Sequence, residues 1–167
     1  MSSLRSFRSV AHSAVCAALL WLVASALLTA CTSSASQHEA IVVEYQRADD
    51  PQAFKQFLPG AVAAGRVPVA HFYADWCGPC RRFKAALAEP QVDEALQRAT
   101  LMEINIDSCQ ELAAYYSVTA VPSFIKLDAQ GRPLAKITSD KWGEDTPDAI
   151  APVMRELVQG RAYDGEK

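Results

Sequence analysis

The sequence predicts an α/β fold in which a mixed central β-sheet carries helices on both faces. Apolar, strand-like segments alternate with helical segments along most of the chain, which is the arrangement that produces such sheets. One buried-type strand, at Val67–Ala74, leads within a few residues into a helical segment, Arg81–Glu89. The length of 167 residues is enough for a leader and one compact domain, and we find no internal repeat.

The first half of the domain is expected to follow a strand–helix–strand–helix order. The expected elements are a strand at Ile41–Tyr45, a helix at Pro51–Gly65 with a candidate break at Pro59-Gly60, the central strand at Val67–Ala74, a helix from Cys77 onward, and a short helix at Pro90–Arg98. The central strand is rich in Val and aromatic residues, which favours burial within a sheet.

The second half is expected to add three strands and two helices. Thr100–Ile106 alternates like a strand, and Ser108 is expected to cap a helix to Tyr116, with Glu111 completing a capping box. Ser123–Asp128 and Leu134–Thr138 form two strands across the turn at Ala129-Gln130-Gly131, and Thr146-Pro147 opens a last helix that ends near Gly160. The predicted order is βαβαβαββα.

Cys77 and Cys80 are the leading candidates for functional residues. They lie three positions apart in Trp76-Cys77-Gly78-Pro79-Cys80, a spacing that lets two sulfur atoms bond and separate again. A helix beginning at Cys77 directs free N–H groups and its positive dipole end at that sulfur, which favours the nucleophilic thiolate. The pattern predicts dithiol–disulfide exchange, with Cys80 resolving a mixed disulfide formed at Cys77.

Structural zinc is the alternative interpretation of two cysteines at this spacing. A zinc site takes four ligands, usually as two close pairs. Downstream of the leader, the remaining candidate ligands are Cys109, His71 and His38, and no regular spacing joins them. We therefore expect neither a metal nor an organic cofactor at the cysteine pair.

Two motifs together resemble the thioredoxin family. The first is Tyr73-Ala74-Asp75-Trp76-Cys77-Gly78-Pro79-Cys80, and the second is Val121-Pro122-Ser123-Phe124. The residues around the first motif are also similar to those of the C-terminal domain of the bacterial disulfide reductase DsbD. The resemblance covers roughly residues 41–160 and implies a thioredoxin fold with protein thiols and disulfides as substrates.

The resemblance assigns roles to three further residues. Pro122 matches a cis-proline that faces the dithiol and offers an extended backbone edge to substrate peptides. Trp76 is expected to shield the Cys77 sulfur, and Asp107 to hydrogen-bond its indole. The alternatives are that Pro122 is only a structural turn proline, that Trp76 is an aromatic used only for packing, and that Asp107 is an ordinary acid at the start of a helix.

His71 is the chief departure from the family pattern. At this position, six residues before the first cysteine, thioredoxins usually place a buried Asp that helps remove the proton from the second cysteine. A neutral His71 can still serve as that base, whereas a protonated one would stabilise the thiolate and make the disulfide a stronger oxidant. The alternative is a hydrogen-bonded core histidine.

Four more residues near the motifs have open roles. Arg81, Arg82 and Lys84 are candidates for lowering the Cys77 pKa and attracting acidic partners, although a solvated helix face explains them as well. Cys109 is a candidate for an intermolecular disulfide or a regulatory thiol, with a spare, partly buried cysteine as the preferred interpretation.

Residues 1–30 are interpreted as a lipoprotein signal peptide. A basic start is followed by the apolar run Ala14–Leu28, which has the length of a signal-peptide core. The run ends in Leu28-Thr29-Ala30-Cys31, which resembles the bacterial lipobox and predicts lipidation of Cys31. The alternatives are an ordinary signal peptide with an incidental cysteine, or an uncleaved anchor. Residues 31–40 are polar and small, as expected for a flexible tether, and residues 41–162 form the predicted domain.

Composition narrows the class of partners. The chain has 16 basic and 19 acidic residues, and the leader holds none of the acids, so the exported protein is acidic. The sequence contains no stripe of basic residues that would indicate nucleic-acid binding. Export fits disulfide chemistry outside the cytosol.

The expected function is that of an exported, lipid-anchored thiol–disulfide oxidoreductase in the bacterial cell envelope, with the choice of membrane left open. Gly78-Pro79 resembles thioredoxin and favours reduction, so a membrane electron donor of the DsbD type is expected to restore the dithiol. The alternatives are a thiol oxidase or isomerase, and a non-catalytic module that binds unfolded or cysteine-bearing proteins beside Pro122.

Overall fold

The structure is a computed structural model that describes residues 40–62 and 65–160. The predicted signal peptide, the lipidation site Cys31, residues 32–39 of the predicted tether and residues 161–162 of the predicted domain lie outside the described part of the chain. Within that part, no helix is both long enough and apolar enough to cross a membrane.

The described residues form five strands, five α-helices and one short 3-10 helix. In chain order these are β1 (Ile41–Glu44), α2 (Pro51–Ala61), β2 (Val67–Tyr73), α3 (Gly78–Ala86), α4 (Pro90–Leu96), β3 (Ala99–Asn105), α5 (Gln110–Tyr115), β4 (Ser123–Leu127), β5 (Pro133–Thr138), η1 (Ser139–Lys141) and α6 (Pro147–Gln159). The predicted elements are all present, with boundaries that differ by a few residues.

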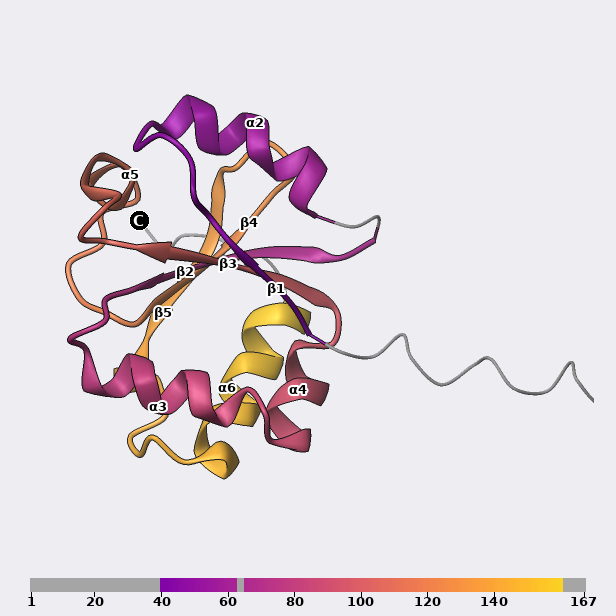
Figure 1. Cartoon of the computed structure of the whole chain (residues 1–167). Helices are drawn as coiled ribbons and strands as arrows, with labels where there is room; N and C mark the ends of the chain where they lie inside the picture. Colours follow the sequence, from indigo (N-terminus) through magenta and orange to yellow (C-terminus); the bar gives the residue numbers. More distant parts are fainter. Residues whose placement is uncertain (1–39, 63–64, 161–167) are drawn as a thin grey trace, which may run out of the picture. The chain divides into compact units, whose positions relative to one another are not determined.

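The five strands make one mixed sheet in the order β1-β3-β2-β4-β5 (Figure 1). β3 pairs in parallel with both β1 and β2, while β4 runs antiparallel to β2 and β5 antiparallel to β4. The central strand β2 therefore has a parallel neighbour on one side and an antiparallel neighbour on the other. Its carboxyl end leads directly into the loop before α3.

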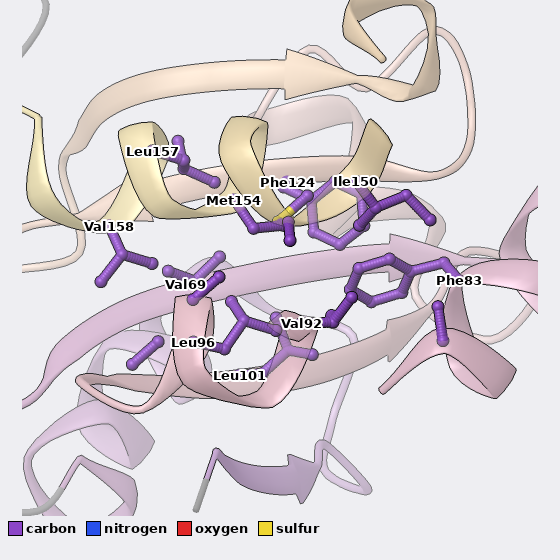
Figure 2. Close-up of a cluster of buried hydrophobic side chains, with 14 of the residues drawn as sticks. Val69, Phe83, Val92, Leu96, Leu101, Phe124, Ile150, Met154, Leu157 and Val158 are labelled. Atoms are coloured by element: carbon purple, nitrogen blue, oxygen red, sulfur yellow. The ribbon is translucent and has the colours of Figure 1, made fainter. Parts of the chain in front are cut away.

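Two hydrophobic clusters cover the two faces of the sheet. α3, α4 and α6 pack on one face through residues such as Phe83, Leu96 and Met154, which are fully buried around Phe124 (Figure 2). α2 and α5 pack on the other face through residues such as Phe54 and Leu112. Alternate residues of β2, β3 and β4 serve the two clusters, as the pleat requires. The predicted mixed sheet with helices on both faces is confirmed.

Two local predictions were wrong. The first helix does not break at Pro59: it continues through this proline to Ala61, and the N–H of Val62 donates to the Leu58 carbonyl at 3.0 Å. The predicted capping box of Ser108 and Glu111 does not form, since α5 has Cys109 at its N-cap without a side-chain cap.

A distant carboxylate takes the place of the capping box. The two oxygens of Asp49 accept hydrogen bonds from the backbone N–H groups of Glu111 and Leu112, each at 2.8 Å. These are orphan donors of the first turn of α5. The loop between β1 and α2 is thereby tied to the helix that follows β3.

Candidate active site

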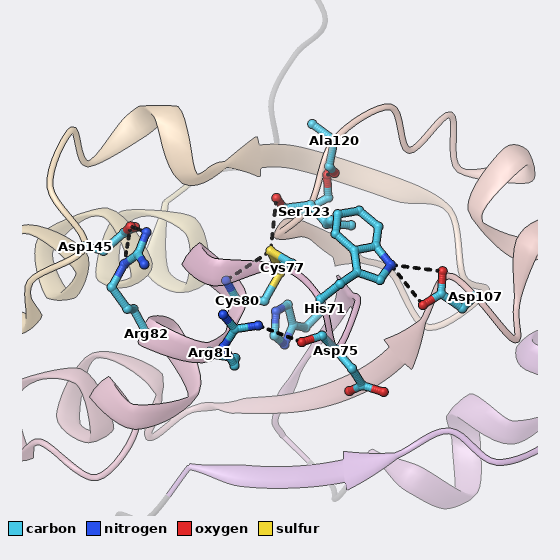
Figure 3. Close-up of a disulfide and its surroundings, with 12 residues drawn as sticks. His71, Asp75, Cys77, Cys80, Arg81, Arg82, Asp107, Ala120, Ser123 and Asp145 are labelled. Atoms are coloured by element: carbon cyan, nitrogen blue, oxygen red, sulfur yellow. Dashed lines mark hydrogen bonds and ion pairs between the residues drawn. A yellow bond between two sulfur atoms is a disulfide. The ribbon is translucent and has the colours of Figure 1, made fainter.

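Cys77 and Cys80 form a disulfide at the start of α3, with their Cα atoms 5.3 Å apart (Figure 3). Cys77 is the N-cap residue, and its Sγ accepts the backbone N–H of Cys80 at 3.1 Å. Pro79 occupies the first turn, where its missing N–H costs no hydrogen bond. The N–H group and the positive end of the helix dipole both stabilise negative charge on the Cys77 sulfur once the disulfide is reduced.

The loop before β4 closes over this disulfide. The peptide bond between Val121 and Pro122 is cis, and the carbonyl oxygen of Val121 lies 3.5 Å from Cys77 Sγ. Ser123 Oγ donates a hydrogen bond to the Ala120 carbonyl at 2.7 Å, which ties the loop to the first residue of β4. The predicted proximity of Pro122 to the dithiol is thus observed, and its role in substrate pairing stays a prediction.

Trp76 is the most exposed large apolar residue of the site, with 66% of its surface accessible. Its indole N–H donates to the Asp107 carboxylate, at 3.1 and 3.3 Å from the two oxygens (Figure 3). Asp107 is itself held by a hydrogen bond from its N–H to Asn105 Oδ1 at 2.8 Å. The expected hydrogen bond between Trp76 and Asp107 is present, and shielding of the sulfur by Trp76 stays a prediction.

The three basic residues of α3 all have partners. Arg81 donates to the Asp75 carbonyl at 2.8 Å, and Arg82 forms an ion pair with Asp145 at 2.6 Å. Lys84 Nζ lies 3.0 Å from Glu103 Oε2. Nearby carboxylates offset the charges of Arg82 and Lys84, which weakens their expected effect on the Cys77 sulfur.

His71 lies on β2, fully buried beneath the helix that carries Cys80. Its ring stacks on Phe124, with the centroids 4.5 Å apart and the planes 5° from parallel, and meets Phe83 edge-on at 5.0 Å. Burial lowers the pKa of His71, and this effect exceeds the opposing influence of Glu103. The imidazole is therefore neutral at neutral pH, which is the form that can accept a proton.

Glu103 is a site residue that the sequence did not reveal. It is paired in register with His71 across β2 and β3, and its Oε1 lies 3.5 Å from His71 Nδ1. Although burial raises its pKa, contacts with His71 and Lys84 hold the pKa of this carboxyl below the usual value. The sequence did contain a signal for this position. Glu103 lies two residues after the buried Leu101 on the same strand, so both side chains point to the core-facing side of the sheet.

Cys109 is the one free cysteine among the described residues, and it is buried at the N-cap of α5. Burial raises the pKa of its thiol, so it is poorly ionised. Its burial fits the preferred interpretation of a spare cysteine. Among residues 40–62 and 65–160, no group of three or more His, Cys, Asp or Glu side chains is arranged to hold a metal ion.

A mixed five-stranded sheet with a Cys-x-x-Cys disulfide at a helix start, facing a cis-proline loop, defines the class of thioredoxin-fold thiol–disulfide oxidoreductases. The chain belongs to the thioredoxin family, whose family model matches residues 48–156. The predicted family and fold are confirmed.

Individual relatives agree with this assignment. The mitochondrial Thioredoxin-2 of Schizosaccharomyces pombe is 36% identical over 76 residues, which are 46% of this chain and 55% of that protein. The thiol:disulfide interchange protein DsbD 2 of Pseudomonas aeruginosa is 33% identical over 105 residues, 60% of this chain and 17% of that protein. The chain thus spans only part of the length of these relatives. A crystal structure of the thioredoxin NaTrxh from Nicotiana alata shares the fold, with a TM-score of 0.50, 17% identity, and coverage of 75% of this chain and 99% of that one.

Proposed function

We propose that this chain is an exported, lipid-anchored thiol–disulfide oxidoreductase that reduces protein disulfides in the bacterial cell envelope. The observation that carries the proposal is the Cys77–Cys80 disulfide at the start of α3, with the N–H of Cys80 directed at the Cys77 sulfur. That arrangement stabilises a thiolate and places a second sulfur within bonding distance of it.

The reaction proceeds through a mixed disulfide. The Cys77 thiolate attacks one sulfur of a substrate disulfide, forms the Cys77–substrate bond, and releases the other substrate sulfur as a thiolate. Cys80 loses its proton and attacks the Cys77 sulfur, which releases the second substrate sulfur and forms the Cys77–Cys80 disulfide. Two electrons pass from the protein dithiol to the substrate, and the proton of Cys80 ends on a released substrate thiolate.

Two features favour reduction over oxidation. Gly78-Pro79 between the cysteines resembles thioredoxin, whose potential is about −270 mV against about −120 mV for the oxidant DsbA. An oxidant would need a protonated His71 to stabilise the reduced form, but burial lowers the pKa of that imidazole. A neutral ring adds no positive charge to stabilise the reduced form.

The expected location and electron source rest on different support. The lipobox-like Leu28-Thr29-Ala30-Cys31 supports export and lipidation of Cys31. Similarity to DsbD proteins, named for thiol:disulfide interchange, supports a membrane electron donor of that type. Replacing Cys31 with Ala is expected to abolish incorporation of labelled fatty acid in a bacterial host, and unchanged labelling would contradict the anchor.

A disulfide-reduction assay tests the proposed activity. The wild-type protein is expected to reduce an insulin-like substrate with dithiothreitol as donor, whereas Cys77→Ser is expected to be inactive. Cys109→Ala is the matched cysteine control and should keep wild-type activity, because Cys109 is buried outside the reactive pair. Equal and negligible rates for the wild type and Cys77→Ser would refute the enzyme and favour a module that only binds.

Trapping identifies the physiological substrates. Cys80→Ala is expected to stall the mixed disulfide at Cys77, so partners isolated under non-reducing conditions carry a disulfide to this residue. If the trapped fraction is the same in a variant that lacks both cysteines, the proposed chemistry is wrong.

A further inference from the structure

A carboxylate and a neutral imidazole lie side by side in the core directly behind the redox site. Glu103 stands on β3 beside His71 on β2, and the side chain of Glu103 is only 11% exposed while that of His71 is 0% exposed. Lys84 reaches the other carboxylate oxygen of Glu103 from α3, at 3.0 Å. A charged carboxylate in the core is costly unless it is paired, and Lys84 supplies the opposite charge that offsets this cost.

The aromatic rings around His71 fix its orientation. Phe124 stacks against one face of the imidazole and Phe83 meets it edge-on, so the ring has little freedom to turn. Nδ1 faces Glu103 Oε1 at 3.5 Å, an ion-pair distance, and neither ring nitrogen has a hydrogen-bond partner among the described residues. Figure 3 shows the imidazole beneath the disulfide, next to the buried face of α3 that carries Cys80 and Phe83.

We propose that Glu103 is a positioning residue for the resolving step: it holds His71 in the tautomer and orientation that accept the proton of Cys80. This inference rests on the proposed function and extends it to a carboxylate on a different strand. Lys84 serves as the counter-charge that keeps Glu103 ionised.

The step balances as a proton relay. While substrate is bound to Cys77, the Cys80 thiol gives its proton to neutral His71, and the resulting imidazolium is stabilised by the Glu103 carboxylate. The Cys80 thiolate then attacks the Cys77 sulfur. The imidazolium returns its proton to the departing substrate thiolate, so His71 and Glu103 end in their initial states.

The charges around His71 set the expected pH dependence. Glu103 raises the pKa of His71 and Lys84 lowers it, while burial lowers it most. Tyr73 is the other titratable neighbour on β2, with its ring 5.8 Å from the imidazole and its ring face beneath Lys84 at 3.8 Å. Removing the charge of Glu103 should therefore lower the pKa of His71 further.

The resolving step is measurable with Ellman's reagent. Reduced protein releases a first equivalent of thionitrobenzoate when Cys77 attacks the reagent, and a second when Cys80 displaces the remaining half. The rate of the second release is followed against pH. Neutral His71 is the active form, so the rate should rise with pH through the titration of this imidazole.

Glu103→Gln is expected to change both features of that profile. The plateau rate should fall about tenfold or more, because the base is weaker. The midpoint should move to lower pH by about 1 unit or more, because an opposite charge next to the imidazole is lost. Glu44→Gln is the matched control: Glu44 is paired in register with Glu103 on β1 but is exposed. A Glu103→Gln profile with the midpoint of Glu44→Gln overturns the inference, even if its plateau is lower, since misfolding reduces the active amount without moving a midpoint.

Two further measurements separate the possible failures. The NMR titration of His71 in the oxidised protein reports its contact with Glu103 without any turnover, and Glu103→Gln should lower its midpoint. If the wild type reduces no disulfide, the proposed function fails on its own. If Glu103→Gln does not fold, Lys84→Met is measured in its place. Losing this cation should raise the midpoint of the His71 titration. An unchanged midpoint contradicts the inference.

Discussion

Phe124 joins the hydrophobic core to the redox site, and Phe124→Leu is expected to destabilise the protein more than an equivalent change elsewhere. Its ring is fully buried and contacts three others: His71 and Phe83 at 4.5 Å and Trp142 at 5.7 Å between centroids. An aromatic pair contributes about 0.5–1.5 kcal/mol beyond area burial, so losing three removes about 1.5–4.5 kcal/mol.

Phe72→Leu is the matched control for this prediction. Phe72 is equally buried but packs on the opposite face of the sheet, and Tyr116 at 5.8 Å is its aromatic neighbour among the described residues. The two substitutions change side-chain volume identically, so the cavity contributions are similar. The expected difference in unfolding free energy is therefore about 1–3 kcal/mol, with Phe124→Leu the less stable.

Urea unfolding of the oxidised proteins at neutral pH measures this difference. Phe124→Leu should also slow the second release of thionitrobenzoate, because His71 loses the ring that orients it, whereas Phe72→Leu should not. Equal destabilisation by the two substitutions would refute the aromatic contribution. A slow second release in both variants would show that the effect on the site is not specific.

Three other predictions follow from separate contacts. Burial lowers the pKa of His71 in the folded chain, so the unfolded chain binds more protons below its ordinary pKa near 6.5, and stability falls as the pH falls. Between pH 7.5 and 5.5 the wild type should lose more unfolding free energy than His71→Gln in urea titrations; parallel losses would show that the imidazole is not buried neutral. Asp49→Ala removes the cap of α5 and should cost about 1–2 kcal/mol by the same method, and a loss under about 0.5 kcal/mol would mean that the cap is dispensable. Asp107→Asn weakens the hold on the Trp76 indole and should lower kcat/KM for disulfide reduction about two- to fivefold, whereas an unchanged kcat/KM would remove this contact from the mechanism.

The reactive pair was predictable because its signals are local. Cys77, Pro79 and Cys80 lie within four residues, and the strand before them and helix after them are visible in the hydrophobic pattern. The fold was predictable for the same reason, together with the resemblance that Trp76 and Pro122 carry. These predictions needed no knowledge of how distant strands align.

The partners of His71 were not predictable in this way. Glu103 contacts His71 because β2 and β3 pair in a register that aligns the two residues, and a single sequence does not state that register. The predicted capping box at Ser108 was wrong for a related reason. The acceptor for the N–H of Glu111 is Asp49, which lies 62 residues earlier in the chain. Contacts between distant segments therefore account for what the sequence missed.

The ionisation of Cys77 in the reduced protein is the most direct test of the account. Alkylation rates against pH, read for each cysteine by mass spectrometry, give its pKa, with buried Cys109 as an internal reference whose pKa is raised. The helix start and the Cys80 N–H predict a midpoint for Cys77 well below the ordinary value of about 8.5. A midpoint at or above about 8.5, close to that of Cys109, would contradict a reactive thiolate at this position.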